Sequence, residues 1–135
     1  MSLIIPYLYL GSIDEASNMN WLRDNDIKVI LNVASEVPLY SNCDIKTYKI
    51  YLNDSPLQDI LPILQYTYSI IDEAIKNRKN ILVHCYAGIS RSASIVIAYL
   101  IMKYGISLQD VYNYVKSKRN IINPNYGFIE QLKIL

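Results

Sequence analysis

The sequence of 135 residues has little cysteine, histidine or glycine and no excess of either charge. It contains two cysteines and one histidine, so the usual Cys and His ligands of a zinc site are missing and we expect no metal. The 13 basic and 12 acidic residues give a net charge of +1, so we expect no nucleic-acid partner. No signal peptide, membrane span or myristoylation site is present in this sequence, so we predict no membrane association.

The apolar content is high enough for one compact core. Of the residues, 52% are apolar and 19% are charged, and no linker or repeat divides the chain, so we predict a single domain over residues 1–135. Short strand-like stretches alternate with stretches of helical period, which predicts an α/β fold with a central, mostly parallel sheet of about four to five strands and helices on both faces. The predicted strands are Val29–Val33, Thr47–Tyr51 and Ile81–Val83, and the predicted helices are Asn18–Asn25, Ile60–Asn77, Arg91–Tyr104 and Ser107–Ser117.

Residues 81–94 combine a buried strand, a loop and the start of an apolar helix. The strand leads into Cys85, five loop residues, Arg91 and Ser92. The N–H groups and the dipole of a helix N-terminus favour a dianion, and they favour a thiolate at Cys85 as well. The planar fork of Arg91 matches two phosphate oxygens, which a lysine does not. We therefore predict a nucleophile, Cys85, at the floor of a phosphate cradle, with Ser92 hydrogen-bonded to its sulfur.

The predicted cradle is the loop that follows Cys85. A tight turn between strand and helix would also use small residues, but it would need neither the cysteine nor the arginine. The phosphate-binding loop is predicted to consist of Tyr86, Ala87, Gly88, Ile89, Ser90 and Arg91.

The sequence of the predicted cradle resembles the signature motif of the cysteine-dependent protein phosphatases, and its Ala-Gly-x-Ser-Arg-Ser part is similar to the motif of the dual-specificity branch. The segments Ile5–Ser12 and Ile30–Ala34, and the closing segment Pro124–Leu132, are also similar to the family pattern. The resemblance therefore covers nearly all of the chain. It implies a protein tyrosine phosphatase-like fold and one small catalytic domain of the atypical dual-specificity type over residues 1–135.

Such an enzyme needs a proton donor for the departing oxygen, on a loop near the phosphate. Asp54 follows a predicted strand and lies in the setting in which family members carry their general acid. Asp59 is the alternative, but it stands directly before a helical pattern, with Pro62 in the first turn, where a helix-capping role is expected. We predict that Asp54 is the acid and Asp59 the cap.

Three further residues are predicted to support the site. His84 is expected to hold the loop through its ring nitrogens. Asn32 and Asn125 lie where family members use polar side chains to brace the active-site loops, although turn or strand-end chemistry would explain both equally well.

Two other features have ordinary explanations. Lys116, Lys118 and Arg119 form the densest basic cluster, which is more typical of a solvated helix end than of a binding site. Cys43 lies in a polar stretch and is expected to be a spare thiol rather than a redox partner of Cys85.

The resemblance implies a protein phosphatase that acts through a phosphocysteine intermediate, without cofactor, on phosphorylated protein substrates. The loop has no basic residue at its variable positions, unlike phosphoinositide phosphatases, and the chain lacks the tyrosine-lined recognition loop of tyrosine-specific enzymes. We therefore expect phosphoserine and phosphothreonine to be accepted as well as phosphotyrosine. The alternatives are a phosphate-binding module with little turnover and a phosphatase for a glycan, RNA or lipid ester. Because oxidation would inactivate Cys85, a reducing compartment is expected, the cytoplasm or the nucleus.

Overall fold

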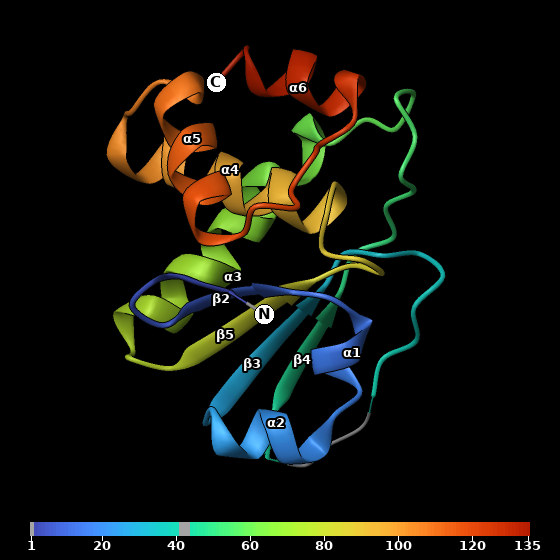
Figure 1. Cartoon of the computed structure of the whole chain (residues 1–135), viewed down its shortest axis with the longest axis vertical. Helices are drawn as coiled ribbons and strands as arrows, with labels where there is room; N and C mark the ends of the chain where they lie inside the picture. The colour runs from blue at the N-terminus through green and yellow to red at the C-terminus, as the bar shows by residue number, and fades with distance from the viewer. Residues whose placement is uncertain (1, 41–43) are drawn as a thin grey trace.

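The computed structural model describes residues 2–40 and 44–135 and contains a five-stranded sheet (Figure 1). The strand order is β1-β2-β5-β3-β4. β1 pairs with β2 in antiparallel fashion, and the pairs β2·β5, β5·β3 and β3·β4 are parallel. The predicted mostly parallel α/β sheet is therefore confirmed. The strands are β1 (Ser2–Ile5), β2 (Leu8–Gly11), β3 (Ile27–Asn32), β4 (Lys46–Lys49) and β5 (Asn80–His84).

Helices cover both faces of this sheet, as predicted. Figure 1 shows α1 and α2 on one side and α4, α5 and α6 on the other, and α3 packs against α4 and β5. The predicted helix Ile60–Asn77 is divided into a 3₁₀ turn and α3. The helices are α1 (Ile13–Ala16), α2 (Met19–Asp24), η1 (Leu61–Ile63), α3 (Leu64–Lys76), α4 (Arg91–Tyr104), α5 (Leu108–Lys118) and α6 (Tyr126–Leu132).

The core is divided by the sheet into two parts of unequal size. The smaller part lies beneath α1 and α2 and includes Ala16, Leu22 and Leu82. The larger part contains the buried residues of α3, α4 and α5. Because β5 is the central strand and is buried on both faces from Ile81 onward, it contains the run Ile-Leu-Val, which is apolar without alternation.

α4 has the predicted bounds, and its carboxyl end is defined by local chemistry. Every residue from Arg91 to Ile101 is buried, which accounts for the nearly unbroken apolar sequence. Gly105 ends the helix in the left-handed region with φ 64°, and its amide donates to the carbonyl of Ile101 at 2.9 Å. The start of α4 follows the carboxyl end of β5, to which the loop 85–90 connects it.

Within the two described ranges, none of the helices combines the length and the apolar character that crossing a bilayer requires.

Candidate active site

The candidate site lies at the carboxyl end of the parallel strands. The loop 85–90 follows β5, and the segments that follow β3 and β4 begin at the same edge of the sheet because the three strands are parallel. Residues distant in sequence are therefore brought together here, as is usual for open α/β sheets.

The carbonyl groups of the loop 85–90 are bound by surrounding parts of the protein. Two backbone amides and the guanidinium of Arg119 supply the donors, and the ring of His84 lies at the first carbonyl. The contacts are Ile13 N to Tyr86 O (2.9 Å), Arg119 Nη2 to Ala87 O (3.2 Å), Arg119 Nε to Gly88 O (2.9 Å), Asn123 N to Ile89 O (2.8 Å) and His84 Nδ1 to Cys85 O (3.0 Å).

These contacts determine where the loop amides point. In a trans peptide the C=O of one residue and the N–H of the next point in opposite directions, and no described peptide bond is cis. Carbonyls that are bound on the outside therefore turn the following N–H groups toward the inside of the loop. The amide of Gly88 shows this directly, since it donates to Cys85 Sγ at 3.2 Å. The loop can thus surround a phosphate with backbone donors.

Gly88 is required at its position by the backbone. Its φ is 69°, and a Cβ there would lie 2.6 Å from the carbonyl oxygen of Gly11. A larger residue would be strained and would push the loop away from β2. The tight loop predicted from this glycine therefore has a steric cause in the neighbouring strand.

Cys85 lies at the floor of the loop, 2% exposed. Its Sγ is 3.1 Å from Ser92 Oγ, the contact predicted from the sequence. Together with the Gly88 amide, this places two hydrogen-bonding groups at the sulfur. Both would stabilise negative charge on it, during attack and when the sulfur departs.

The guanidinium of Arg91 is held from one side by a carboxylate that the sequence analysis did not single out. Nη1 and Nη2 donate to the two oxygens of Glu36 at 2.5 and 2.7 Å, and Nη1 also donates to the carbonyl of Leu52 at 3.0 Å. Of the five N–H donors, three have partners among the described residues. The remaining pair, on Nε and Nη2, forms one edge of the fork and is suited to two phosphate oxygens.

The electrostatics agree with this pairing. The hydrogen bond from Arg91 lowers the pKa of Glu36 from 4.5 to about 2. The same bond, against the effect of burial, raises the pKa of Arg91 above its usual value, and the charges of Cys85 and Asp54 act in the same direction. Arg91 is therefore a permanent cation that is buried but paired.

The segment that carries Glu36 is held by two side chains from neighbouring strands. Asn32, at the end of β3, donates to the carbonyl of Val37 at 2.8 Å and accepts from the amide of Ala34 at 2.9 Å. The ammonium of Lys49 donates to the carbonyls of Ala34 and Val37, and burial lowers its pKa. The position of Glu36, and with it that of Arg91, depends on these contacts.

Asp54 and Asp59 lie in different environments. Asp54 is exposed, its Oδ1 accepts from Asn125 Nδ2 at 3.0 Å, and its charge contributes to the raised pKa of Arg91. Asp59 accepts from the amide of Leu61 at 3.3 Å, but it lies one residue before the N-cap of η1, which is Ile60 and has no side-chain cap hydrogen bond. The geometry favours Asp54 as the carboxylate at the cradle.

Asn125 combines the two roles that the sequence left open. Its Oδ1 accepts from the amide of Phe128 at 2.9 Å and caps α6, while its side-chain amide holds Asp54. Its own backbone amide donates to Ser90 Oγ at 2.9 Å. His84 is buried, and this burial lowers its pKa, which favours a neutral ring beside the loop.

Sequence reasoning missed Glu36 and the contacts of Lys49, and it interpreted Arg119 as part of a solvated cluster. Arg119 instead binds two carbonyls of the phosphate loop. Cys43 lies outside the described residues.

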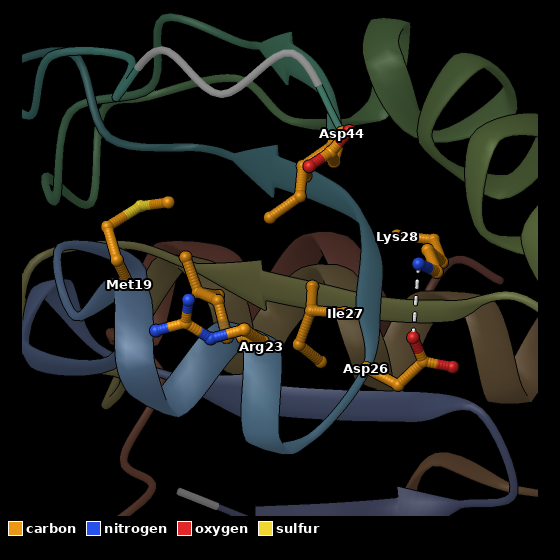
Figure 2. Close-up of a pocket in the computed structure, with 8 residues that line it drawn as sticks. Met19, Arg23, Asp26, Ile27, Lys28 and Asp44 are labelled. Carbon is orange, nitrogen blue, oxygen red and sulfur yellow. Dashed lines mark ion pairs between the residues drawn. The ribbon is translucent and has the colours of Figure 1, made fainter.

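The hollow drawn in Figure 2 lies at the opposite edge of the sheet. It has a volume of about 380 Å³ and is lined by residues of α2 and the start of β3, with an ion pair of 3.1 Å between Lys28 and Asp26. It contains none of the candidate residues. Over residues 2–40 and 44–135, no group of three or more His, Cys, Asp or Glu side chains is placed to hold a metal ion.

The family comparison agrees with this geometry. Residues 8–134 match the family described as "Dual specificity phosphatase, catalytic domain". Mouse protein phosphatase Slingshot homolog 1 is 42% identical over 131 residues, covering 97% of this chain and 13% of that protein. Human dual specificity protein phosphatase 7 is 41% identical over 131 residues, covering 96% and 31%. The chain thus spans less than a third of the length of these curated relatives.

Solved structures show the same architecture over nearly the whole chain. DUSP15 has a TM-score of 0.95 and 35% identity, with 99% of this chain and 85% of that chain covered. The human tyrosine phosphatase-like serine/threonine/tyrosine-interacting protein has a TM-score of 0.93 and 32% identity, with 99% and 93% covered.

Proposed function

Because this chain belongs to the dual-specificity phosphatase family, we propose that it hydrolyses phosphotyrosine, phosphoserine and phosphothreonine esters in proteins. The observation that carries the proposal is the loop 85–90, whose carbonyls are bound from outside and whose Gly88 amide donates to the sulfur of Cys85. A phosphate held there would lie directly above the nucleophile. We further propose that residues 1–135 form one catalytic domain that acts in the cytoplasm, with the nucleus as a second compartment.

The reaction proceeds in two steps. The Cys85 thiolate attacks phosphorus, the bond to the ester oxygen breaks, and Asp54 gives its proton to that oxygen. The loop amides and the free edge of Arg91 stabilise the charge on the phosphoryl oxygens. Water then attacks the phosphocysteine, Asp54 takes its proton, and Ser92 stabilises the departing thiolate. Every group in this scheme is supplied by the chain or by water.

The substrate class follows from the rim of the cradle. The variable loop positions Tyr86, Ala87, Ile89 and Ser90 carry no charge, so the loop itself offers no cation for the additional phosphates of an inositol lipid. Protein phosphoesters fit this rim better than polyanionic ones.

The test is steady-state hydrolysis of matched phosphotyrosine and phosphothreonine peptides by the wild type and by Cys85→Ser, with reductant present. We expect turnover of both peptides and its loss in the variant. Turnover that survives in Cys85→Ser would refute the nucleophile. Binding of both peptides without turnover would identify a phosphate-binding module instead.

The assignment of the acid is tested by leaving-group dependence. Asp54→Ala should slow hydrolysis most for esters with poorly acidic leaving groups, whereas Asp59→Ala should leave the dependence on the leaving group unchanged. Asp59 is the matched control because it is an exposed aspartate on the same segment. If the effects of the two substitutions were exchanged, the roles would be exchanged as well.

A further inference from the structure

A hollow of about 470 Å³ adjoins the phosphate loop on the side of α1. It is formed where the loop and the start of α1 are joined by the hydrogen bond from Ile13 N to Tyr86 O, 2.9 Å long. The residues that determine its chemistry are Ile13, Asp14, Glu15, Tyr86, Arg119 and Ile121.

The hollow is within reach of a substrate peptide whose phosphorylated residue occupies the cradle. Tyr86 and Ala87, which line it, follow Cys85 directly in the sequence. An extended peptide advances about 3.3 Å per residue, so a side chain one or two positions from the phosphorylated residue would lie over the hollow while the phosphate occupies the cradle.

The charge of the hollow is negative. Asp14 is exposed, and its carboxylate has no hydrogen-bond or ion-pair partner in the described part of the chain. Glu15 adds a second carboxylate, which accepts from the amide and hydroxyl of Ser12. The one guanidinium, that of Arg119, is turned toward the outer wall of the phosphate loop. Glu15 and Arg119 are thus both engaged, and Asp14 is the exposed carboxylate of the hollow.

The remaining walls are apolar and accessible. Tyr86 is 55% exposed and Ile121 is 50% exposed, and Ile13 is partly buried between them and the core. A side chain with a long aliphatic stem and a cationic end matches this combination, because the stem can cover the apolar walls while the charge reaches a carboxylate. The ring of Tyr86 also offers a face to a guanidinium.

We propose that this hollow is a subsite for an arginine or lysine of the substrate, one or two residues from the phosphorylated residue, with Asp14 as the residue that selects it. The proposal rests on the proposed phosphatase function and names its preferred substrates: phosphoproteins with a basic residue next to the phosphosite.

The experiment compares kcat/KM for phosphopeptides that carry Arg, Ala or Glu at one flanking position at a time. We expect Arg to be preferred over Ala about two- to fivefold at one or two positions, the range expected for an exposed ion pair. The preference should shrink when the ionic strength is raised to about 1 M, where the screening length is short. In Asp14→Lys the preference should reverse toward Glu.

Asp24→Lys is the matched control. It makes the same change in net charge, but Asp24 ends α2 just before β3, which is parallel to β5. It therefore lies at the opposite edge of the sheet, about 20 Å of strand away from the loop, and should leave the preference for Arg unchanged.

Equal kcat/KM for the Arg, Ala and Glu peptides, or a preference for Arg that Asp14→Lys leaves intact, would overturn the subsite. The affinity of Cys85→Ser for the same peptides provides a readout that needs no turnover. If the wild type hydrolysed nothing while this variant still bound the Arg peptide more tightly than the Glu peptide, the phosphatase function would fail and the subsite would stand.

Discussion

The pairing of Arg91 with Glu36 leads to a prediction that separates two roles for an acidic residue beside a phosphate site. The carboxylate could orient the guanidinium, or it could only weaken its charge. The side chain of Arg91 is 7% exposed, and its two bonds to Glu36 are 2.5 and 2.7 Å long. Such a short, two-point contact indicates that orientation dominates. Replacing Glu36 by Gln removes the charge and one acceptor while keeping the shape.

The expected size of the effect follows from the exposure of the partner. A hydrogen bond to a charged group contributes about 1.5–3 kcal/mol, but Glu36 is 53% exposed, so screening reduces the contribution to about 1–2 kcal/mol. If this free energy is lost from the transition state, kcat/KM falls by about 5- to 30-fold. The assay is hydrolysis of an aryl phosphate, with inhibition by inorganic phosphate measured in parallel.

Glu130→Gln is the matched control, because Glu130 on α6 forms an exposed ion pair of 2.8 Å with Lys133, the residue that follows this helix. It should change kcat/KM by less than about twofold. If Glu36→Gln left kcat/KM unchanged, Glu36 would not orient Arg91. If the variant had a higher kcat/KM and was inhibited more strongly by inorganic phosphate, Glu36 would only compete with the substrate for Arg91.

The same pair predicts a pH dependence of stability. The pKa of Glu36 is lowered from 4.5 to about 2. Its contribution is therefore fully present above about pH 4.5 and is lost as the pH falls toward 2. Between pH 5 and pH 2.5 the wild type should lose more of its free energy of unfolding, measured with urea, than Glu36→Gln does. An equal loss would show that the pair adds nothing to stability.

Two further predictions concern packing away from Cys85. Gly127→Ala should destabilise the fold by about 1–3 kcal/mol and lower kcat, because the new Cβ would lie 2.1 Å from the carbonyl oxygen of Pro56, two residues from Asp54. An unchanged kcat and an unchanged midpoint of urea unfolding would contradict this prediction. Tyr99→Phe should lower the free energy of unfolding by about 1–2 kcal/mol without changing kcat/KM, because the buried hydroxyl donates to Asp72 at 2.8 Å. The control is Tyr104→Phe, which alters an exposed ring and should leave the free energy of unfolding unchanged in the same urea assay.

The sequence predicted the elements whose causes are local. α4 begins and ends as predicted, because a buried apolar run is followed by a glycine in the left-handed region. The hairpin of β1 and β2 was not predicted as strands. Each strand has only four residues, and its turn uses Tyr7 at φ 75° rather than a glycine or asparagine, so the usual turn signal is missing.

The parts of the site that escaped prediction depend on contacts between distant segments. Glu36 and Arg91 are 55 positions apart, and the pattern of either segment alone contains no sign of the other. Arg119 binds backbone carbonyls, which every residue carries, so no residue type could have indicated its partner. The cysteine, arginine and serine of the cradle were predictable because their spacing is set within one short loop.

The position of the proposed acid depends on α6 more than on the strand that precedes it. Asn125 holds the Asp54 carboxylate, and the backbone of Gly127 packs on Pro56. At the other end of the segment that carries Asp54, the amide of Ile60 donates to Gln131 of α6 at 2.6 Å. These three contacts fasten both ends of the acid-bearing segment to one short helix. Since α6 also packs on α4, which begins at Arg91, the groups proposed to donate the proton and to bind the phosphate share one support.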